Sequence, residues 1–168
     1  MSRTFLLGWL LLLAACQPSG LGPLVVDGPE LHPSLVTRRL EDAAKHQLAP
    51  VLRDNPYLST DSEFVDVLAR YASQGRLGGG EGVRAGLYAL YRGEAEGQVG
   101  LYGLEAVSPA EADRLEGVLR AAIAFQDRLG LSRVHREGNV LVVVWQRGVS
   151  ASCWEAVNAE VVERLTAR

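Results

Sequence analysis

The chain has 168 residues with 17 Lys or Arg against 20 Asp or Glu, which gives a formal charge of −3 at neutral pH. Both signs are spread along the chain without a basic cluster. This distribution argues against a nucleic-acid-binding protein and against electrostatic attachment to anionic lipid, because both need a concentrated basic face. The length is that of one domain with its own hydrophobic core.

The first residues have the layout of an export signal. A short start carrying Arg3 is followed by an uncharged apolar run over residues 5–13, and then by the small residues Ala14 and Ala15. This order is typical of a cleaved secretory signal. A membrane-spanning helix needs about 20 apolar residues, so the run is too short for a permanent transmembrane anchor.

The end of this segment, Leu13-Ala14-Ala15-Cys16, resembles the lipobox of bacterial lipoprotein precursors. The resemblance covers the signal alone. It implies that the Cys16 thiol receives a diacylglycerol and that cleavage falls between Ala15 and Cys16. In many bacteria a further acyl chain, such as palmitate, joins the new amine. Plain secretion with cleavage after Ala15, or a buried core helix, are the alternatives.

Lipidation would place the protein on a membrane of the cell envelope, either the outer face of the cytoplasmic membrane or the outer membrane. Removing residues 1–15 takes away Arg3, so the mature chain has 17 − 1 = 16 basic against 20 acidic residues, a charge of −4. Cys16 and Cys153 are the two cysteines, so a lipid on Cys16 leaves Cys153 without a disulfide partner. Residues 16–30 are predicted to be a lipidated N-terminus and flexible tether, because Gly, Pro and Ser are dense in 17–23.

Residues 31–77 are predicted to be a helical segment. One helix runs from Pro33 to Leu48, and Pro50 ends it. A second follows a capping box formed by Thr60 and Glu63, and it buries Phe64, Val67, Leu68 and Tyr71. Residues 75–82 hold five glycines and form a joint to the rest of the chain. Their GxGxxA pattern is not a dinucleotide site, because a helix precedes it and a strand follows.

Residues 83–168 are predicted to contain two ββα units. The strands cover 85–92, 98–106, 132–136 and 140–146, and the run 140–145 reads as a central strand. Helices follow the capping boxes that begin at Ser108 and Ser152. Their predicted buried residues are Leu115, Val118, Leu119, Ala122, Phe125 and Leu129, then Trp154, Val157, Val161, Val162 and Leu165. In the second strand, Gly100 and Gly103 indicate a bulge or close packing.

These elements predict an α+β fold, in which N-terminal helices precede a four-stranded, mainly antiparallel sheet with both later helices on one face. Residues 31–168 are expected to form one compact domain. The other face of the sheet would need the N-terminal helices or a partner to cover it. Tyr88, Tyr91, Tyr102 and Trp145 lie on the predicted strands and are candidates for a ligand or interface surface. The alternative is that these aromatic residues are core.

No catalytic or metal signature is present. His32, His46 and His135 lack metal-ligand spacing, and Glu94 and Glu96 share a hairpin tip, where solvent keeps them ordinary acids. No cofactor or metal is expected. The favoured function is a non-catalytic binding or assembly module, anchored through its lipid and able to engage an envelope protein. A lipid-anchored enzyme, using Cys153 or a concealed acid pair, and a purely structural lipoprotein are the alternatives, and the oligomeric state stays open.

Overall fold

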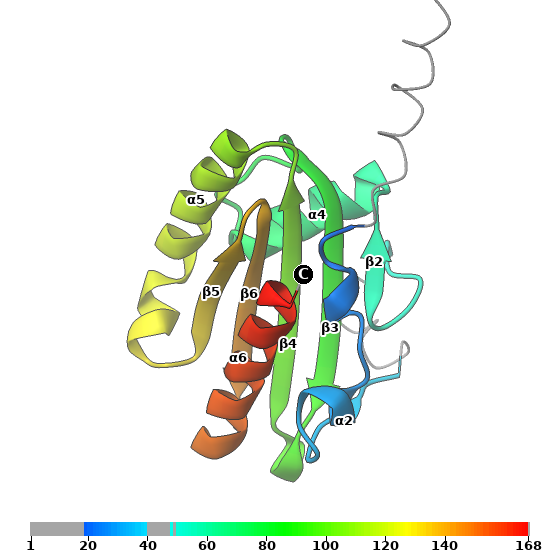
Figure 1. Cartoon of the computed structure of the whole chain (residues 1–168), viewed down its shortest axis with the longest axis vertical. Coiled ribbons are helices and arrows are strands. Elements are labelled where there is room, and N and C mark those ends of the chain that lie inside the picture. Colours follow the sequence, from blue (N-terminus) through cyan, green and yellow to red (C-terminus); the bar gives the residue numbers. More distant parts are fainter. Residues whose placement is uncertain (1–18, 40–47, 49, 168) are drawn as a thin grey trace, which may run out of the picture.

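A computed structural model describes residues 19–39, 48 and 50–167 of the chain. Within these residues the fold is a mixed one of helices and an antiparallel sheet, which confirms the α+β class (Figure 1). Four long strands lie side by side in the order β3 (Val83–Arg92), β4 (Gln98–Ala106), β6 (Val140–Arg147) and β5 (Ser132–Glu137). These are the four strands that the sequence predicts, and β6 is a central strand as expected.

The sheet has six strands and not four, because two short strands extend it beyond β3. β1 (Val36–Thr37) pairs with Tyr91 and Arg92, and β2 (Tyr57–Ser59) pairs with the earlier part of β3. The helix expected from Pro33 is therefore wrong where β1 forms. Its later residues, 40–47, lie outside the described part of the chain. Strands of two and three residues are too short to show an alternating pattern.

Helices cover both faces of the sheet, whereas the sequence predicted both later helices on one face. α4 (Ser62–Ala72) and α5 (Pro109–Arg128) pack on one face, and α6 (Ala151–Thr166) packs on the other. In Figure 1, α4 lies behind the sheet and α6 in front of it. The strands themselves require this arrangement. On β6, Leu141 and Val143 belong to the first core, while Val140, Val142 and Val144 belong to the second. Apolar side chains on both faces need two covering layers.

The N-terminal segment completes the second core. It contains the 3-10 helix η2 (Gly22–Leu24) and the short helix α2 (Gly28–Leu31), and Leu21 and Leu24 are fully buried. The predicted flexible tether is therefore wrong over residues 19–30, since this stretch packs with α6 against the sheet. The glycines and prolines that suggested flexibility instead allow tight turns between buried leucines.

Side-chain caps begin the three long helices. Ser108 caps α5 as predicted, by accepting a hydrogen bond from the Glu111 amide at 3.2 Å. The other two caps differ from the prediction: Asp61 and not Thr60 caps α4, and Ser150 and not Ser152 caps α6. Each new cap lies one or two residues from the expected one and uses the same chemistry, a side-chain oxygen that accepts an otherwise unpaired amide.

Most predicted helix core residues are buried, with three clear exceptions on the outer surfaces of the helices. Phe125 and Leu129 of the α5 region are 71% and 56% exposed, and Val162 of α6 is 41% exposed. Phe125 and Leu129 lie off the buried side of α5, which carries Ala112, Leu115, Leu119, Ala122 and Ile123. Phe125 and Leu129 were therefore predicted buried from spacing alone, and that prediction is wrong.

Candidate functional site

A groove of about 1060 Å³ lies between α4, α5 and the sheet, on the face of the first core. Its volume is comparable with that of small-molecule sites, which span roughly 300–1,000 Å³. The C-terminal half of α4, the C-terminal half of α5, and the strands β4, β5 and β6 supply its walls and floor. Its apolar lining consists of Val67, Tyr71, Ala72, Tyr102, Ile123, Leu131, Val143 and Trp145.

Aromatic rings form the floor of the groove, and strand register places them together. Tyr88 of β3 lies directly opposite Tyr102 of β4, and their rings stack with centroids 6.0 Å apart. Tyr102 in turn contacts Trp145 at 6.0 Å and Tyr71 of α4 at 5.5 Å, the latter edge to face. This chain of rings joins three strands to α4, and it is a rigid, apolar surface.

Gly100 explains how the large indole of Trp145 fits on the sheet. The two residues are directly paired across β4 and β6, and a Cβ at position 100 would collide with the ring atoms of Trp145. The close packing that the sequence indicated at Gly100 and Gly103 is therefore confirmed. Gly103 faces the opposite side, where a Cβ would meet Leu21. Each glycine accommodates a large side chain on its own face of the sheet.

The polar lining of the groove has no acidic side chain among the residues that the structure describes. It consists of Arg70, Gln74, Gln126, Ser132, Gln146 and Arg147. Arg70 donates from Nε to the backbone oxygen of Asp66 at 3.2 Å, and Arg147 ends β6 beside Gln98. Both arginines are exposed, and neither forms an ion pair with another described residue.

One lining residue, Trp145, carries a buried Nε1 that makes no hydrogen bond of good geometry among the described residues, although it lies close enough to the Tyr102 hydroxyl to affect the Tyr102 pKa. Oε1 of Gln146 is also buried without a partner there, but Gln146 alternates with Trp145 along β6, so its side chain points to the other face of the sheet. The Gln146 amide nitrogen donates to the backbone oxygen of Gly130 at 3.5 Å, which orients the amide. Buried polar groups without partners are uncommon and costly, so the indole nitrogen of Trp145 is a point in the groove where a ligand or ordered water gains a hydrogen bond.

Burial keeps the floor tyrosines in their neutral form. It raises the pKa of Tyr88, and it raises the pKa of Tyr102 well above its ordinary value, with Tyr71 adding to both shifts. Neither hydroxyl ionises near neutral pH. These side chains therefore offer ring faces and neutral hydroxyls and are not general bases.

Of the four aromatic residues predicted as a ligand or interface surface, the structure brings three together. Tyr102 and Trp145 line the floor of the groove, and Tyr88 stacks on Tyr102 but is buried and does not itself line the groove. Tyr91 belongs to the other core, where its hydroxyl donates to the backbone oxygen of Val26 at 3.0 Å. Side chains alternate between the two faces along a strand, and Tyr88 and Tyr91 are three residues apart, so they point to opposite faces of the sheet. This alternation was the sequence signal that could have assigned the two tyrosines to different cores.

The sequence reasoning missed Arg70, Arg147 and the role of Tyr71. Arg70 and Tyr71 lie on the C-terminal half of α4, and Arg147 lies at the end of β6. Their convergence depends on how α4 packs against the sheet, about which the sequence carries no local pattern. The one usable sequence signal was strand alternation, which places Arg147, two residues beyond Trp145, on the same face of β6.

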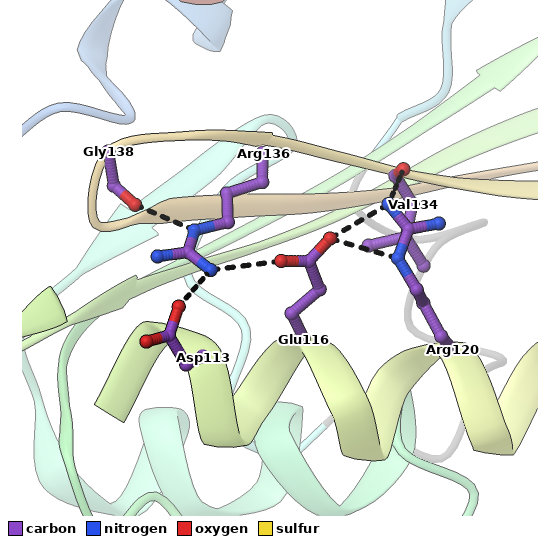
Figure 2. Close-up of polar contacts among 6 residues, drawn as sticks. All are labelled: Asp113, Glu116, Arg120, Val134, Arg136 and Gly138. Carbon is purple, nitrogen blue, oxygen red and sulfur yellow. Dashed lines mark hydrogen bonds and ion pairs between the residues drawn. The ribbon is translucent and has the colours of Figure 1, made fainter. Parts of the chain in front are cut away.

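A second polar cluster joins α5 to the outer strand β5, and Figure 2 shows that its charges are mutually paired. Arg136 contacts Asp113 at 2.6 Å and Glu116 at 2.9 Å, and Glu116 also accepts from Arg120. Hydrogen bonds from Arg136 and Arg120 hold the pKa of Glu116 below its usual value. The cluster fastens a helix to an edge strand, and it is not a pair of acids with one raised pKa.

Cys153 lies in the first turn of α6 and is 3% exposed. It borders a cavity of about 190 Å³, and the hydroxyl of Ser34 lies 3.7 Å from its sulfur. Ser34 also contacts Nδ1 of His32 at 2.8 Å. His135 is engaged elsewhere, with Asn158, so no direct contact between a histidine and the thiol is present in the described residues.

The remaining predicted groups do not converge. Glu94 and Glu96 are exposed at the hairpin tip, as expected, and His46 lies outside the described part of the chain. Over the described ranges no group of three or more His, Cys, Asp or Glu side chains is arranged to hold a metal ion. The search for a membrane-crossing helix, limited to the same ranges, finds none of sufficient length and apolarity. Ala15 and Cys16 precede the described residues.

Comparison with protein-family models, with curated proteins and with solved structures finds no match. The groove, its chemistry and the sequence of the N-terminal segment therefore carry the functional argument alone.

Proposed function

We propose that the protein is a non-catalytic binding module, anchored by lipid at Cys16 to a membrane of a bacterial cell envelope, and that the groove between α4 and α5 is its binding site. The anchor rests on the resemblance of Leu13-Ala14-Ala15-Cys16 to a lipobox. The binding role rests on the groove. The two parts are independent and are tested separately.

The observation that supports binding most strongly is the combination of an aromatic floor with unpaired polar groups in one groove. In the Glu116 cluster the charged side chains pair with one another. In the groove, Arg70 and Arg147 lack an ion pair among the described residues, and the buried Nε1 of Trp145 makes no hydrogen bond of good geometry there. A bound ligand would satisfy groups that the fold leaves unsatisfied.

The packed N-terminal segment supports an arrangement in which the lipid holds the domain close to the bilayer. Ser19 donates to a carboxylate oxygen of Glu105 at 2.7 Å, and the Gly20 amide donates to the other at 3.0 Å. Two residues separate Cys16 from Ser19. At roughly 3.5 Å per residue, the lipid-bearing residue would lie within about 10 Å of this docking point.

The same geometry would leave the groove free of the anchor. Glu105 is on the α6 face of β4, and Tyr102 is on the α4 and α5 face, three residues earlier. Strands rise about 3.3 Å per residue, so Tyr102 lies about 10 Å along β4 from the docking point. A ligand, or a segment of an envelope partner, would reach the groove without displacing the N-terminal segment.

Labelling with radioactive palmitate in a lipoprotein-processing bacterium tests the anchor. The wild-type chain is expected to be labelled, shortened and recovered with membranes. Cys16→Ala is expected to remain as unlabelled, full-length precursor, because no sulfur is available for acylation. The matched control, Cys153→Ala, keeps its label. Labelled and shortened protein from Cys16→Ala would show that the anchor assignment is wrong.

A further inference from the structure

The charged side chains among the described lining residues of the groove are two arginines. Arg70 comes from the last turn of α4 and Arg147 from the end of β6, and both line the groove. No Asp or Glu is among the described lining residues. A protein with a net negative charge thus has, among the described lining residues of this site, charged side chains of positive sign alone. Guanidinium groups pair strongly with carboxylates and phosphates, so the site favours an anionic head group.

The rest of the groove is apolar and suits a hydrocarbon body. Tyr102 and Trp145 form the floor, and Val67, Ile123 and Leu131 add aliphatic lining. Burial of hydrocarbon against such a surface contributes about 0.8 kcal/mol for each methylene. The positive and apolar parts belong to the same groove, so one molecule that has both an anionic and an apolar part would contact both.

A buried polar atom adds a preference near the aromatic floor. Nε1 of Trp145 makes no hydrogen bond of good geometry among the described residues, and a carboxylate or phosphate oxygen is a stronger acceptor than the neutral Tyr102 hydroxyl beside it. A purely aliphatic ligand without oxygen would offer this nitrogen no acceptor.

We infer that the groove binds a single-chain anionic amphiphile, with its carboxylate or phosphate at Arg70 and Arg147 and its chain across Tyr102 and Trp145. This inference rests on the proposed function, because a protein held at a membrane meets such molecules there. A free fatty acid supplies the carboxylate, and a single-chain phospholipid supplies the phosphate. Both present the same chemistry to the groove.

The tryptophans provide a direct reporter. Trp9 is in the predicted signal, so the mature chain contains Trp145 in the groove floor and Trp154 in the opposite core. Trp154→Phe leaves Trp145 as the reporter of the groove, and Trp145→Phe leaves Trp154 as the control. Both are made in the full mature chain, residues 16–168, with Cys16→Ser, so that neither detergent nor lipid competes with the probes.

Four probes with the same chain length separate the contributions: laurate, dodecyl phosphate, dodecanol and dodecyltrimethylammonium, each below its aggregation limit. Laurate, dodecyl phosphate or both are expected to change Trp145 emission saturably and to leave Trp154 emission unchanged. The alcohol and the cation are expected to bind at least about tenfold more weakly, because they lack a partner for the arginines. A preference between the two anions identifies the carboxylate or the phosphate as the head group.

Arginine variants test where the head group lies. Arg70→Gln combined with Arg147→Gln is expected to weaken anion binding about tenfold or more, with dodecanol binding unchanged. Arg114→Gln is the matched control, since Arg114 pairs with Glu111 in the first part of α5, away from the groove, and it should leave anion affinity unchanged.

The outcomes separate the ligand class from the binding role. If dodecanol or the cation binds Trp145 as tightly as the anions do, or if the double arginine variant binds anions normally, the anionic class is wrong while the groove remains a binding site. If no probe changes Trp145 emission, or if the probes change only Trp154 emission, both the amphiphile and the groove assignment are overturned.

Discussion

At the scale of single residues, the groove exists because a glycine makes space for an indole. Trp145 occupies the volume that a side chain at position 100 would fill, directly across the β4–β6 pair. Tyr102 then contacts the same indole from the same strand as Gly100. A glycine in a strand normally weakens it, and here that cost is offset by the packing of a large aromatic ring.

Gly100→Ala is expected to destabilise the protein by about 1–3 kcal/mol, because its Cβ collides with the ring of Trp145 and the indole must move. Equilibrium unfolding in urea measures the loss, and Trp145 emission reports the movement. The matched control is Gly117→Ala in α5, where an added Cβ meets nothing within 4 Å. The control should stabilise the protein by about 0.5–1 kcal/mol, since alanine is the better helix former. An unchanged urea midpoint for Gly100→Ala would contradict this account of the floor.

At the scale of elements, one side chain completes the edge of the sheet. β2 pairs with residues 86–88 of β3 and β1 with residues 91–92, which leaves Ala89 and Leu90 between them. The Asn55 amide occupies this gap. Its Oδ1 accepts from the Leu90 amide at 2.9 Å, and its Nδ2 donates to the backbone oxygens of Leu90 and Arg38, both at 2.8 Å. Asn55 thus acts as a substitute for a missing strand residue.

Asn55→Ala is expected to cost about 1–3 kcal/mol, because it leaves the buried Leu90 amide without an acceptor. Asn55→Asp should cost a similar amount at neutral pH, since a carboxylate would replace the donor that faces two carbonyl oxygens. Thermal or urea unfolding measures both. Asn139→Ala in the β5–β6 turn serves as the control, because no side-chain hydrogen bond of Asn139 is found among the described residues. Wild-type stability in Asn55→Ala would show that water replaces the amide without loss.

The elements that the sequence predicted correctly are those with long, repetitive patterns. The strands β3, β4 and β6 follow apolar runs bounded by turns that contain glycine, and α5 follows a Ser108 cap. β5 is mainly polar and was predicted as the hairpin partner of β6. β1 and β2 lack such patterns because they have two and three residues. The N-terminal segment was misjudged because Leu21 and Leu24 are separated by glycine and proline, and their burial depends on α6, which lies far along the chain.

The candidate site was predicted only in part, for a similar reason. Tyr102 and Trp145 could be named because they lie on strands, and the close packing at Gly100 was expected. The groove itself depends on the distance between α4 and α5, which are separated by two strands in the sequence. The predicted uncovered face of the sheet does not exist within the described residues, since α6 and the N-terminal segment cover it.

At the scale of the whole molecule, the sheet joins two cores, and the N-terminal segment belongs to the second. Glu105 connects this segment to the sheet, because its carboxylate accepts from Ser19, Gly20 and Arg84. If Cys16 carries lipid, any force on the anchor passes to this docking point. The packing of the N-terminal segment and the membrane attachment would then both depend on the Glu105 carboxylate, whose side chain is 3% exposed.

The protonation of Glu105 makes the packing of the N-terminal segment against the sheet dependent on pH. Burial acts to raise the pKa of Glu105, but hydrogen bonds from Arg84, Ser19 and the Gly20 amide outweigh it and hold the pKa below the ordinary value of 4.5. A carboxylate whose pKa is lowered by folding stabilises the folded state above its unfolded pKa. That stabilisation is lost as the pH falls through the lower, folded pKa.

Glu105→Gln is therefore expected to cost about 1–3 kcal/mol at pH 7, the range for hydrogen bonds to a charged group, and progressively less below about pH 4.5. Urea unfolding of the variant and the wild type across this pH range measures the difference, and hydrogen exchange at Leu21 and Leu24 shows whether the N-terminal segment loosens. Glu81→Gln makes the same charge change at an exposed acid and should have little effect at any pH. A loss in Glu105→Gln that is equal at acidic and neutral pH would mean that amide shape, and not the carboxylate charge, matters at this position. Undiminished protection of Leu21 at pH 7 would mean that the buried leucines hold the N-terminal segment without Glu105.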